Sequence, residues 1–293
     1  LVENLYKIKK VRKAILIDNL KLNKLNYLFN IKKKNKIEFF QRDLNNAKSL
    51  NDFKNINTVF HLASMTNAEK SFAVKKEMYS NNLNCFNTVV NFCKNKNVKL
   101  VHLSSTSIYG KQADLVDENC EKKYLKPQSP YAKIKLIEEK ILKKIGNKLK
   151  YNTFRLGTIA GVSKGIRFHT AVNSFCLNAA IGEKIKVYKT ALHQYRPYLS
   201  IQDVFKLFKF ILENNFFEND IYNVVSNNFT VYQIIKKIKK YHKNVKIIYV
   251  DSPIMNQLSY HVSKKKLSSR GLYLNSNLDR DIANTLNLFR NVK

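Results

Sequence analysis

Short apolar runs alternate with longer amphipathic stretches along the first half of this 293-residue chain. Residues 14–17, 58–62 and 100–103 are brief runs rich in aliphatic and β-branched side chains, which is typical of β-strands. Residues 83–92 and 131–145 instead repeat apolar side chains at helical spacing. Because neighbouring parallel strands need a crossover between them, this alternation predicts βαβ units, an α/β fold and a doubly wound parallel sheet.

The second half of the chain is less regular. After Gly157, a stretch without clear periodicity runs through Gly161 and Gly165. The sequence predicts further strands over 37–40, 152–156, 221–225 and 244–250, and further helices over 171–180, 204–212 and 231–241. We therefore expect a smaller carboxyl-terminal region beside the doubly wound sheet.

The composition limits the class of protein. Hydrophobic residues make up 44% of the chain and aromatic residues 12%, which is enough for a sizeable core. The apolar runs are short and interrupted, and no charged and then apolar leader opens the chain, so we expect a cytoplasmic protein without a membrane span. The four cysteines lie apart, with no CxxC pair and no clustered His, which predicts reduced thiols and no metal site. They are Cys85, Cys93, Cys120 and Cys176.

The formal charge of +32 would by itself indicate a polyanionic partner. Only 8 of the 53 basic residues are Arg, however, and Arg is the side chain that grips phosphates in a planar fork. The lysines are spread along the whole chain, and a local run such as 32–34 is typical of a solvated loop. We therefore do not expect a nucleic-acid partner, although nucleic-acid binding stays as an alternative.

All seven glycines lie at position 110 or later. A dinucleotide-binding sheet needs a glycine-rich turn after its first strand, so that the backbone can approach a pyrophosphate at the start of a helix. Residues 1–6 have the pattern of the helix that follows such a turn, and the chain does not begin with Met. We expect the first strand and its glycine loop to precede residue 1.

A tyrosine and a lysine four residues apart are candidates for acid–base chemistry. Tyr131 and Lys135 fall within a predicted helix, where residues four apart share a face, so the ammonium can lie beside the phenol. A nearby cation favours the phenolate of a group that normally titrates at about 10. With 45 lysines in the chain this spacing is not selective, because Tyr6, Tyr232 and Tyr260 also have Lys four residues later.

A predicted strand that ends in hydroxyl side chains distinguishes one of these pairs. Residues 101–110 read Val-His-Leu-Ser-Ser-Thr-Ser-Ile-Tyr-Gly. They come before the predicted helix that contains Tyr131. Parallel sheets bind ligands at the carboxyl ends of their strands, so a Ser here can bond to a substrate hydroxyl while Tyr131 takes its proton. The alternative is a strand-end turn whose hydroxyls only cap the backbone.

Two acids also follow predicted strands. Asp18 ends the strand at 14–17, and Asp43 follows the strand at 37–40. A carboxylate in this position suits the two ribose hydroxyls of an adenosine and repels a 2′-phosphate, which favours NAD over NADP. Either acid can equally be a turn or cap residue.

Taken together, these segments resemble the active-site stretch of extended short-chain dehydrogenases/reductases, a family that includes nucleotide-sugar epimerases, dehydratases and reductases. The resemblance rests on residues 104–110, Ser-Ser-Thr-Ser-Ile-Tyr-Gly, and on residues 127–135, Pro-Gln-Ser-Pro-Tyr-Ala-Lys-Ile-Lys. Further matches follow in the family's order at 17–19, 42–44, 59–63, 82, 154–157 and 196–203. The resemblance implies a Rossmann-type NAD-binding domain over 1–165. It also implies a mainly substrate-binding region over 166–293, from which some segments return to the first domain.

The resemblance implies a role for each matching residue. The catalytic residues would be Ser105, Tyr131 and Lys135. The cofactor would be bound by Asp18, Asn19, Asp43, Leu44, Leu62, Ala63, Ser64 and Asn82, together with Tyr131 and Lys135. The substrate would meet Ser105, Thr158, Asn173 and Arg196, and the stretch 255–257 would help to shape its pocket. Arg196 would bind the substrate's diphosphate, although an ion pair at the surface is the alternative for this side chain.

Departures from the family pattern narrow the reaction. Dehydratases of this family place Asp and Glu directly after the catalytic hydroxyl residue, whereas this chain has Thr106 and Ser107. Thr158 stands where the family usually has Asn. We therefore expect an NAD-dependent epimerase that acts on a nucleotide-linked sugar through a transient keto intermediate, and that forms a homodimer. The alternatives are a reductase or dehydrogenase that exchanges its cofactor, and a non-catalytic family member that binds nucleic acid.

Overall fold

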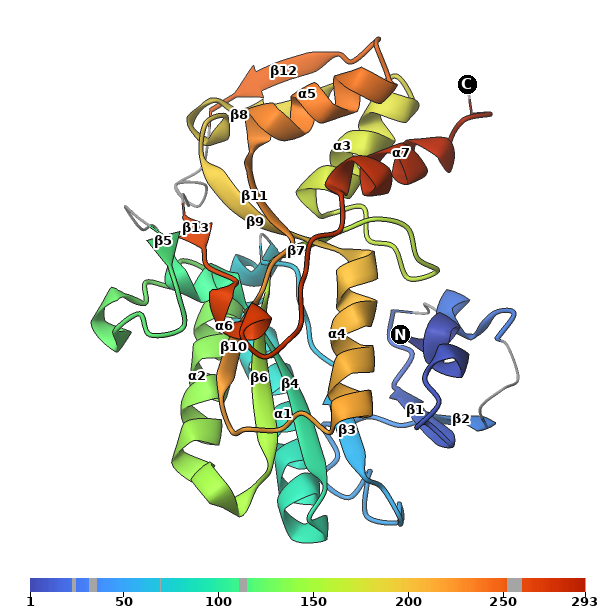
Figure 1. Ribbon diagram of the computed structural model, residues 1–293, viewed down its shortest axis with the longest axis vertical. Helices are drawn as coiled ribbons and strands as arrows, with labels where there is room; N and C mark the ends of the chain where they lie inside the picture. The colour runs from blue at the N-terminus through green and yellow to red at the C-terminus, as the bar shows by residue number, and fades with distance from the viewer. Residues whose placement is uncertain (23–24, 32–35, 69, 111–114, 252–259, 293) are drawn as a thin grey trace. The chain divides into compact units, whose positions relative to one another are not determined.

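The computed structural model of this chain describes residues 1–22, 25–31, 36–68, 70–110, 115–251 and 260–292 (Figure 1). Two compact units interleave along the sequence. Unit 1 comprises Leu1–Ser105, Ser129–Arg155 and Leu207–Tyr222, and unit 2 comprises Thr106–Gln128, Leu156–Lys206 and Asn223–Lys293. The functional division at residue 165 stays a prediction.

Unit 1 is built on parallel strands. β1 (Lys13–Asp18) pairs in parallel with β2 (Lys36–Gln41) in a two-stranded sheet. β3 (Thr58–His61) pairs in parallel with β4 (Lys99–Ser105), and both belong to a four-stranded sheet of order β10-β6-β4-β3. The other two strands of that sheet are β6 (Tyr151–Leu156) and β10 (Ile221–Val224). The parallel ladders require crossover connections, so the α/β prediction is confirmed.

One apolar core serves both sheets of unit 1. Helix α1 (Lys75–Lys96) contributes the buried side chains of Phe86 and Val89, which lie in a cluster with Leu100 of β4. Ile15 of β1 packs against the same cluster. The described residues show no ladder between the two sheets, so apolar packing is what joins β1 and β2 to the rest of the unit.

Helix α2 (Pro130–Ile145) has clear start and stop signals. The Ser129 side chain caps its amino end and accepts a hydrogen bond from the backbone N–H three residues on, at 3.1 Å. Pro130 takes the first helical position, where a missing N–H costs nothing. Gly146 ends the helix at a φ of 58°, which favours glycine. These signals fix the register of the helix that carries the predicted Tyr–Lys pair.

Unit 2 holds three small sheets and most of the remaining helices. One sheet has the order β11-β9-β7, a second pairs β12 with β8, and a third pairs β13 with β5. The strands are β5 (Leu115–Val116), β7 (Thr158–Ala160), β8 (Ile185–Tyr188), β9 (Tyr195–Ser200), β11 (Asn227–Thr230), β12 (Ile247–Val250) and β13 (His261–Val262). The helices are α3 (Ala171–Ala180), α5 (Val231–Tyr241), α6 (Lys265–Ser268) and α7 (Leu278–Asn287), while α4 (Ile201–Asn214) begins in unit 2 and ends in unit 1.

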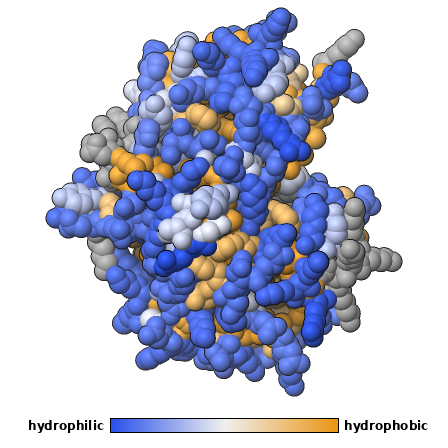
Figure 2. All heavy atoms as spheres, in the orientation of Figure 1, coloured by the Kyte–Doolittle hydropathy of each residue, from blue (hydrophilic) through white to orange (hydrophobic). Residues whose placement is uncertain are grey.

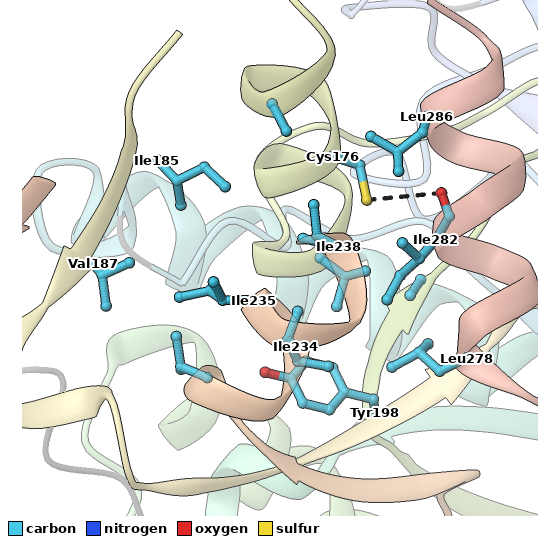
Figure 3. Close-up of a cluster of buried hydrophobic side chains, with 14 of the residues drawn as sticks. Cys176, Ile185, Val187, Tyr198, Ile234, Ile235, Ile238, Leu278, Ile282 and Leu286 are labelled. Atoms are coloured by element: carbon cyan, nitrogen blue, oxygen red, sulfur yellow. Dashed lines mark hydrogen bonds between the residues drawn. The ribbon is translucent and has the colours of Figure 1, made fainter. Parts of the chain in front are cut away.

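A second apolar core lies within unit 2. Figure 3 shows Ile234 and Ile238 of α5 beside Ile282 of α7 and Cys176 of α3. The Cys176 sulfur lies 4.0 Å from the Ile282 carbonyl oxygen. The three helices bury their apolar faces against each other and against Tyr198 of β9, so unit 2 has a core of its own.

Most of the elements predicted from the sequence are confirmed. The helices predicted over 171–180 and 231–241 coincide with α3 and α5. Residues 2–7 form a 3-10 helix, labelled η1 (Val2–Lys7), and not an α-helix. The stretch after Gly157 opens with β7, which was not predicted because a strand of three residues is too short to show periodicity. Residues 161–170 contain no helix or strand, as predicted.

Hydrophilic residues cover most of the face shown in Figure 2, with apolar residues in scattered groups. Among the helices that the structure describes, none is long and apolar enough to cross a membrane. The four cysteines are free thiols. Burial raises the pKa of the Cys93 and Cys176 thiols to about 12, so both stay protonated at neutral pH.

Candidate active site

Helix α2 brings Tyr131 and Lys135 together within unit 1. The Lys135 ammonium lies 5.9 Å from the centre of the Tyr131 ring. Lys135 is only 3% exposed, whereas Tyr131 is half-buried. A buried cation beside a partly accessible phenol suits a base that works on a bound hydroxyl group.

The other Tyr–Lys pairs lack this combination. Tyr232 of α5 is 51% exposed, and Lys236, four residues later, is exposed as well. Tyr260 is buried, and the Lys264 ammonium donates to the backbone carbonyls of Ser226 and Leu274 at 2.8 and 2.7 Å. Burial therefore separates the pair on α2 from pairs that sequence spacing alone could not exclude.

Ser105 is the last residue of β4, and the residue before it ties this strand end to α2. The Ser104 hydroxyl donates to Glu139 Oε1 at 2.6 Å. Arg155 of β6 donates to both oxygens of the same carboxylate, at 3.0 and 2.7 Å. Glu139 is buried, so β4, β6 and α2 are locked together where Ser105 and the Tyr–Lys pair lie.

A second buried acid contacts Lys135 directly. Glu138 Oε2 accepts from the Lys135 ammonium at 2.8 Å and lies 2.9 Å from His102 Nε2. The other ring nitrogen of His102 lies 3.1 Å from the Thr153 hydroxyl. Burial would raise the pKa of Glu138, but the Lys135 charge and the His102 hydrogen bond outweigh it and lower that pKa to about 2. Glu138 is therefore ionised at neutral pH.

These supporting residues were not predicted from the sequence. Glu138 and Glu139 follow Lys135 by three and four residues on a predicted helix, and residues at these spacings lie on the same helix face as Lys135. His102 lies in a predicted buried strand, where a polar side chain needs a partner. These two signals together could have predicted a buried acid under the lysine.

The acids predicted to hold an adenosine lie at the carboxyl ends of β1 and β2. Asp18 Oδ1 accepts from Leu20 N at 2.8 Å, a local turn, and Asp18 Oδ2 accepts from the Tyr27 hydroxyl at 3.3 Å. Burial and the neighbouring Asp18 charge raise the pKa of Tyr27 to about 12. Asp18 is half-buried at a strand end, as predicted from the sequence. Its hydrogen bond with Leu20 N also forms the local turn that was the alternative role for this side chain.

Asp43 is held by amide groups. Its Oδ1 accepts from the backbone and side-chain nitrogens of Asn45 at 2.9 and 2.8 Å, and its Oδ2 accepts from Asn19 at 3.4 Å. The backbone hydrogen bond from Asn45 is the main cause that lowers the pKa of Asp43. The structure thus brings Asn19 and Asp43 together, and their role toward an adenosine stays a prediction. Leu44, by contrast, is 8% exposed and its side chain lies in the core.

The remaining predicted cofactor residues follow β3. Leu62 is 51% exposed directly after the strand, and Ala63 and Ser64 come next. Asn82 of α1 is fully buried, accepts from Met65 N at 2.8 Å and donates to Met65 O at 3.0 Å. Asn82 therefore holds the loop after β3 in place, and its side chain is already used for that purpose.

The predicted substrate residues belong to unit 2. Arg196 of β9 is half-buried and donates to Gln194 Oε1 at 3.2 Å, and burial lowers its pKa. Asn173 of α3 is buried, accepts from Gly161 N at 3.1 Å and donates to Arg167 O at 3.1 Å. Thr158 begins β7. The stretch 255–257 lies outside the described residues.

The donor set of unit 1 fits part of a dinucleotide. Carboxylates at the ends of β1 and β2 suit ribose hydroxyls, and the resemblance implies that Lys135 would meet a second ribose. Residues 1–109 contain no glycine, so this part of the chain has no glycine-rich turn for a pyrophosphate. The residues present therefore suit the two ends of a dinucleotide and not its centre.

Comparisons with known proteins identify the family and the fold. The family model described as "NAD dependent epimerase/dehydratase family" matches residues 11–224. The ADP-L-glycero-D-manno-heptose-6-epimerase of Brachyspira hyodysenteriae is 25% identical over 247 residues, which cover 82% of this chain and 76% of that protein. A trifunctional UDP-glucose 4,6-dehydratase/UDP-4-keto-6-deoxy-D-glucose 3,5-epimerase/UDP-4-keto-L-rhamnose-reductase of Arabidopsis thaliana is 24% identical over 283 residues. The match covers 90% of this chain and 42% of that longer protein.

Solved structures show the same fold. A Thermus thermophilus UDP-glucose 4-epimerase in complex with NAD superposes with a TM-score of 0.80 at 21% identity, covering 95% of this chain and 91% of that one. A Streptomyces venezuelae dTDP-glucose 4,6-dehydratase with NAD bound gives a TM-score of 0.86 at 16% identity, covering 99% and 91%. The predicted Rossmann-type fold is confirmed.

Proposed function

Because the chain belongs to the NAD dependent epimerase/dehydratase family, we propose that it is an NAD-dependent epimerase of a nucleotide-linked sugar. The observation that carries the proposal is the pairing of half-buried Tyr131 with buried Lys135 on α2, in the unit whose strand β4 ends at Ser105. Relatives that act on ADP-, UDP- and dTDP-linked sugars support this substrate class.

Each residue has a defined task in this proposal. Tyr131 takes the proton of a sugar hydroxyl and later returns it to the same oxygen. Lys135 stabilises the phenolate by its charge, and Ser105 donates a hydrogen bond to the sugar oxygen. Bound NAD would supply reversible hydride transfer. The planar carbonyl carbon of the transient keto sugar can accept the hydride back on either face, and return on the opposite face inverts that carbon. Asp18 and Asp43 would hold the adenosine end of NAD, and Lys135 its other ribose.

Thr106 and Ser107 favour epimerisation over dehydration. The resemblance places an Asp and a Glu at these positions in dehydratases, where the acid protonates the leaving water. The Thr106 hydroxyl donates to the Leu156 carbonyl at 3.2 Å, and neither side chain is a carboxylic acid. Elimination of water therefore lacks its acid in this chain.

Product analysis tests the proposal. The full-length protein is incubated with NAD and, separately, with ADP-, UDP- and dTDP-linked hexoses and heptoses, and the sugars are then identified by NMR. We expect one of these sugars to be converted to its epimer with no net formation of NADH. A stoichiometric change in NADH would instead support the reductase or dehydrogenase, and a keto-deoxy product would support a dehydratase.

Tyr131→Phe tests the role of the tyrosine in this assay, and Tyr232→Phe is its matched control. The variant removes the proton acceptor and almost no volume, so it should fold and yet form no epimer. Tyr232→Phe, at an exposed position of α5, should behave like the unaltered protein.

A further inference from the structure

The carboxylate of Glu138 lies against Lys135 and is not used in the proposed reaction. Its side chain is fully buried, as is that of His102, and the Lys135 side chain is 4% exposed. One oxygen, Oε2, serves both neighbours, at 2.8 Å to the Lys135 ammonium and 2.9 Å to His102 Nε2. Because an ionised carboxylate only accepts, the imidazole donates through Nε2.

The other titratable groups around Lys135 add no negative charge. His61 of β3 is fully buried, and burial with the nearby Lys135 charge lowers its pKa to about 3, so it is neutral. Burial is the main cause that raises the pKa of Cys85 of α1 to about 11, so this thiol is neutral as well. His102 of β4 supplies a hydrogen bond and no negative charge.

The second acid of α2 is committed elsewhere. Glu139 accepts two hydrogen bonds from Arg155 at 3.0 and 2.7 Å, and a third from Ser104 at 2.6 Å. Its charge is therefore matched by a guanidinium. Of the described groups that face Lys135, this leaves Glu138 to offset the buried ammonium.

We propose that Glu138, held by His102, is a positioning residue that keeps Lys135 in its ammonium form and fixes the ammonium in place beside Tyr131. The inference rests on the proposed function in one respect, that Lys135 assists Tyr131. A buried lysine without a counter-charge gives up its proton readily, because burial penalises the charged form. Without Glu138, Lys135 would hold its proton and its position beside Tyr131 less firmly, and would favour the phenolate less.

The direct test is the titration of Lys135 itself, measured without NAD or substrate. Lysine labelled at the side-chain nitrogen is followed by NMR across pH, and the Lys135 signal is identified by its loss in Lys135→Arg. In Glu138→Gln, which keeps the shape and removes the charge, we expect Lys135 to release its proton at least one pH unit lower, a tenfold fall in proton affinity. A folded Glu138→Gln protein with unchanged Lys135 titration would overturn the proposal.

Two further variants separate charge from shape. Glu138→Asp keeps the charge, so Lys135 should titrate close to its position in the unaltered chain. A large downward shift in Glu138→Asp would overturn the proposal even if Glu138→Gln did not fold. Glu77→Gln removes one negative charge from the exposed face of α1 and should leave the Lys135 signal unmoved.

Activity supplies the second readout. In Glu138→Gln, the alkaline limb of the kcat/KM profile should move to lower pH, and Glu138→Asp should restore it. A loss of activity at all pH values with no shift of the limb would show a purely structural role. The NMR titration needs no turnover, so failure of the proposed epimerase reaction would not be confused with failure of this inference.

Discussion

Glu139→Gln should strongly destabilise unit 1, although the new side chain is nearly the same size. In the structure, Glu139 and Arg155 are each 4% exposed, and the carboxylate accepts three hydrogen bonds. The amide cannot offset the guanidinium charge, and one of its two terminal groups is a donor that faces other donors. Removing one partner of a buried ion pair costs about 3–5 kcal/mol. That is a large part of the roughly 5–15 kcal/mol by which proteins are stable.

Urea unfolding, followed by circular dichroism, measures this loss as a change in the free energy of unfolding. Glu121→Gln is the control, because it breaks the ion pair with Lys123 in which both side chains are 63% exposed, and it should leave the midpoint unchanged. The double variant Glu139→Gln/Arg155→Met should be more stable than Glu139→Gln alone, since no buried charge is then left unmatched. A loss below about 1 kcal/mol in Glu139→Gln would refute the argument that this pair locks β4 and β6 to α2.

Three further predictions concern activity, cofactor choice and pH. Tyr131→Phe should lower kcat by at least about a hundredfold in a steady-state assay while the unfolding midpoint is kept, and residual activity above about a hundredth would contradict the general-base role. Asp18→Ala should weaken NAD binding and relax discrimination against NADP in calorimetric titrations, and equal binding of both by the unaltered chain would contradict the position of Asp18 at the ribose. Burial raises the pKa of Asp281 to about 6, above its ordinary 3.8, so its contribution to stability is present below pH 3.8 and is lost as pH rises through 6. Asp281→Asn should therefore gain stability relative to the unaltered chain between about pH 4 and 7, measured by urea unfolding at each pH, and a parallel pH dependence of the two proteins would contradict this assignment.

Periodicity identified several long elements, although it missed the helix α7 and the strand β9, and it identified short elements poorly. The helix α5 has apolar Ile234, Ile235 and Ile238 at helical spacing, and its predicted bounds match the structure. β7 and β13, with three and two residues, are defined by hydrogen bonds to partners far along the chain. A short stretch of sequence does not reveal which distant strand it pairs with, and both strands were therefore missed.

The candidate site could be predicted in part. Tyr131 and Lys135 were identified because spacing, a hydroxyl-rich strand end and the resemblance agreed on them. Glu138 was not, because its role depends on His102, which lies 36 positions away and meets it only once β4 packs against α2. The resemblance assigned Asn19 and Asp43 to the adenosine end of the cofactor, but their contact with each other and the use of Asn82 to hold a loop needed the structure.

The central claim, epimerisation by hydride transfer assisted by Tyr131, is tested most directly by running the reaction in deuterated water. The sugar product is examined by NMR at the inverted carbon. In the unaltered protein we expect inversion with the original hydrogen retained and no solvent deuterium at that carbon, and in Tyr131→Phe we expect no inversion. Deuterium at the inverted carbon would show that the hydrogen left as a proton, and would contradict hydride transfer.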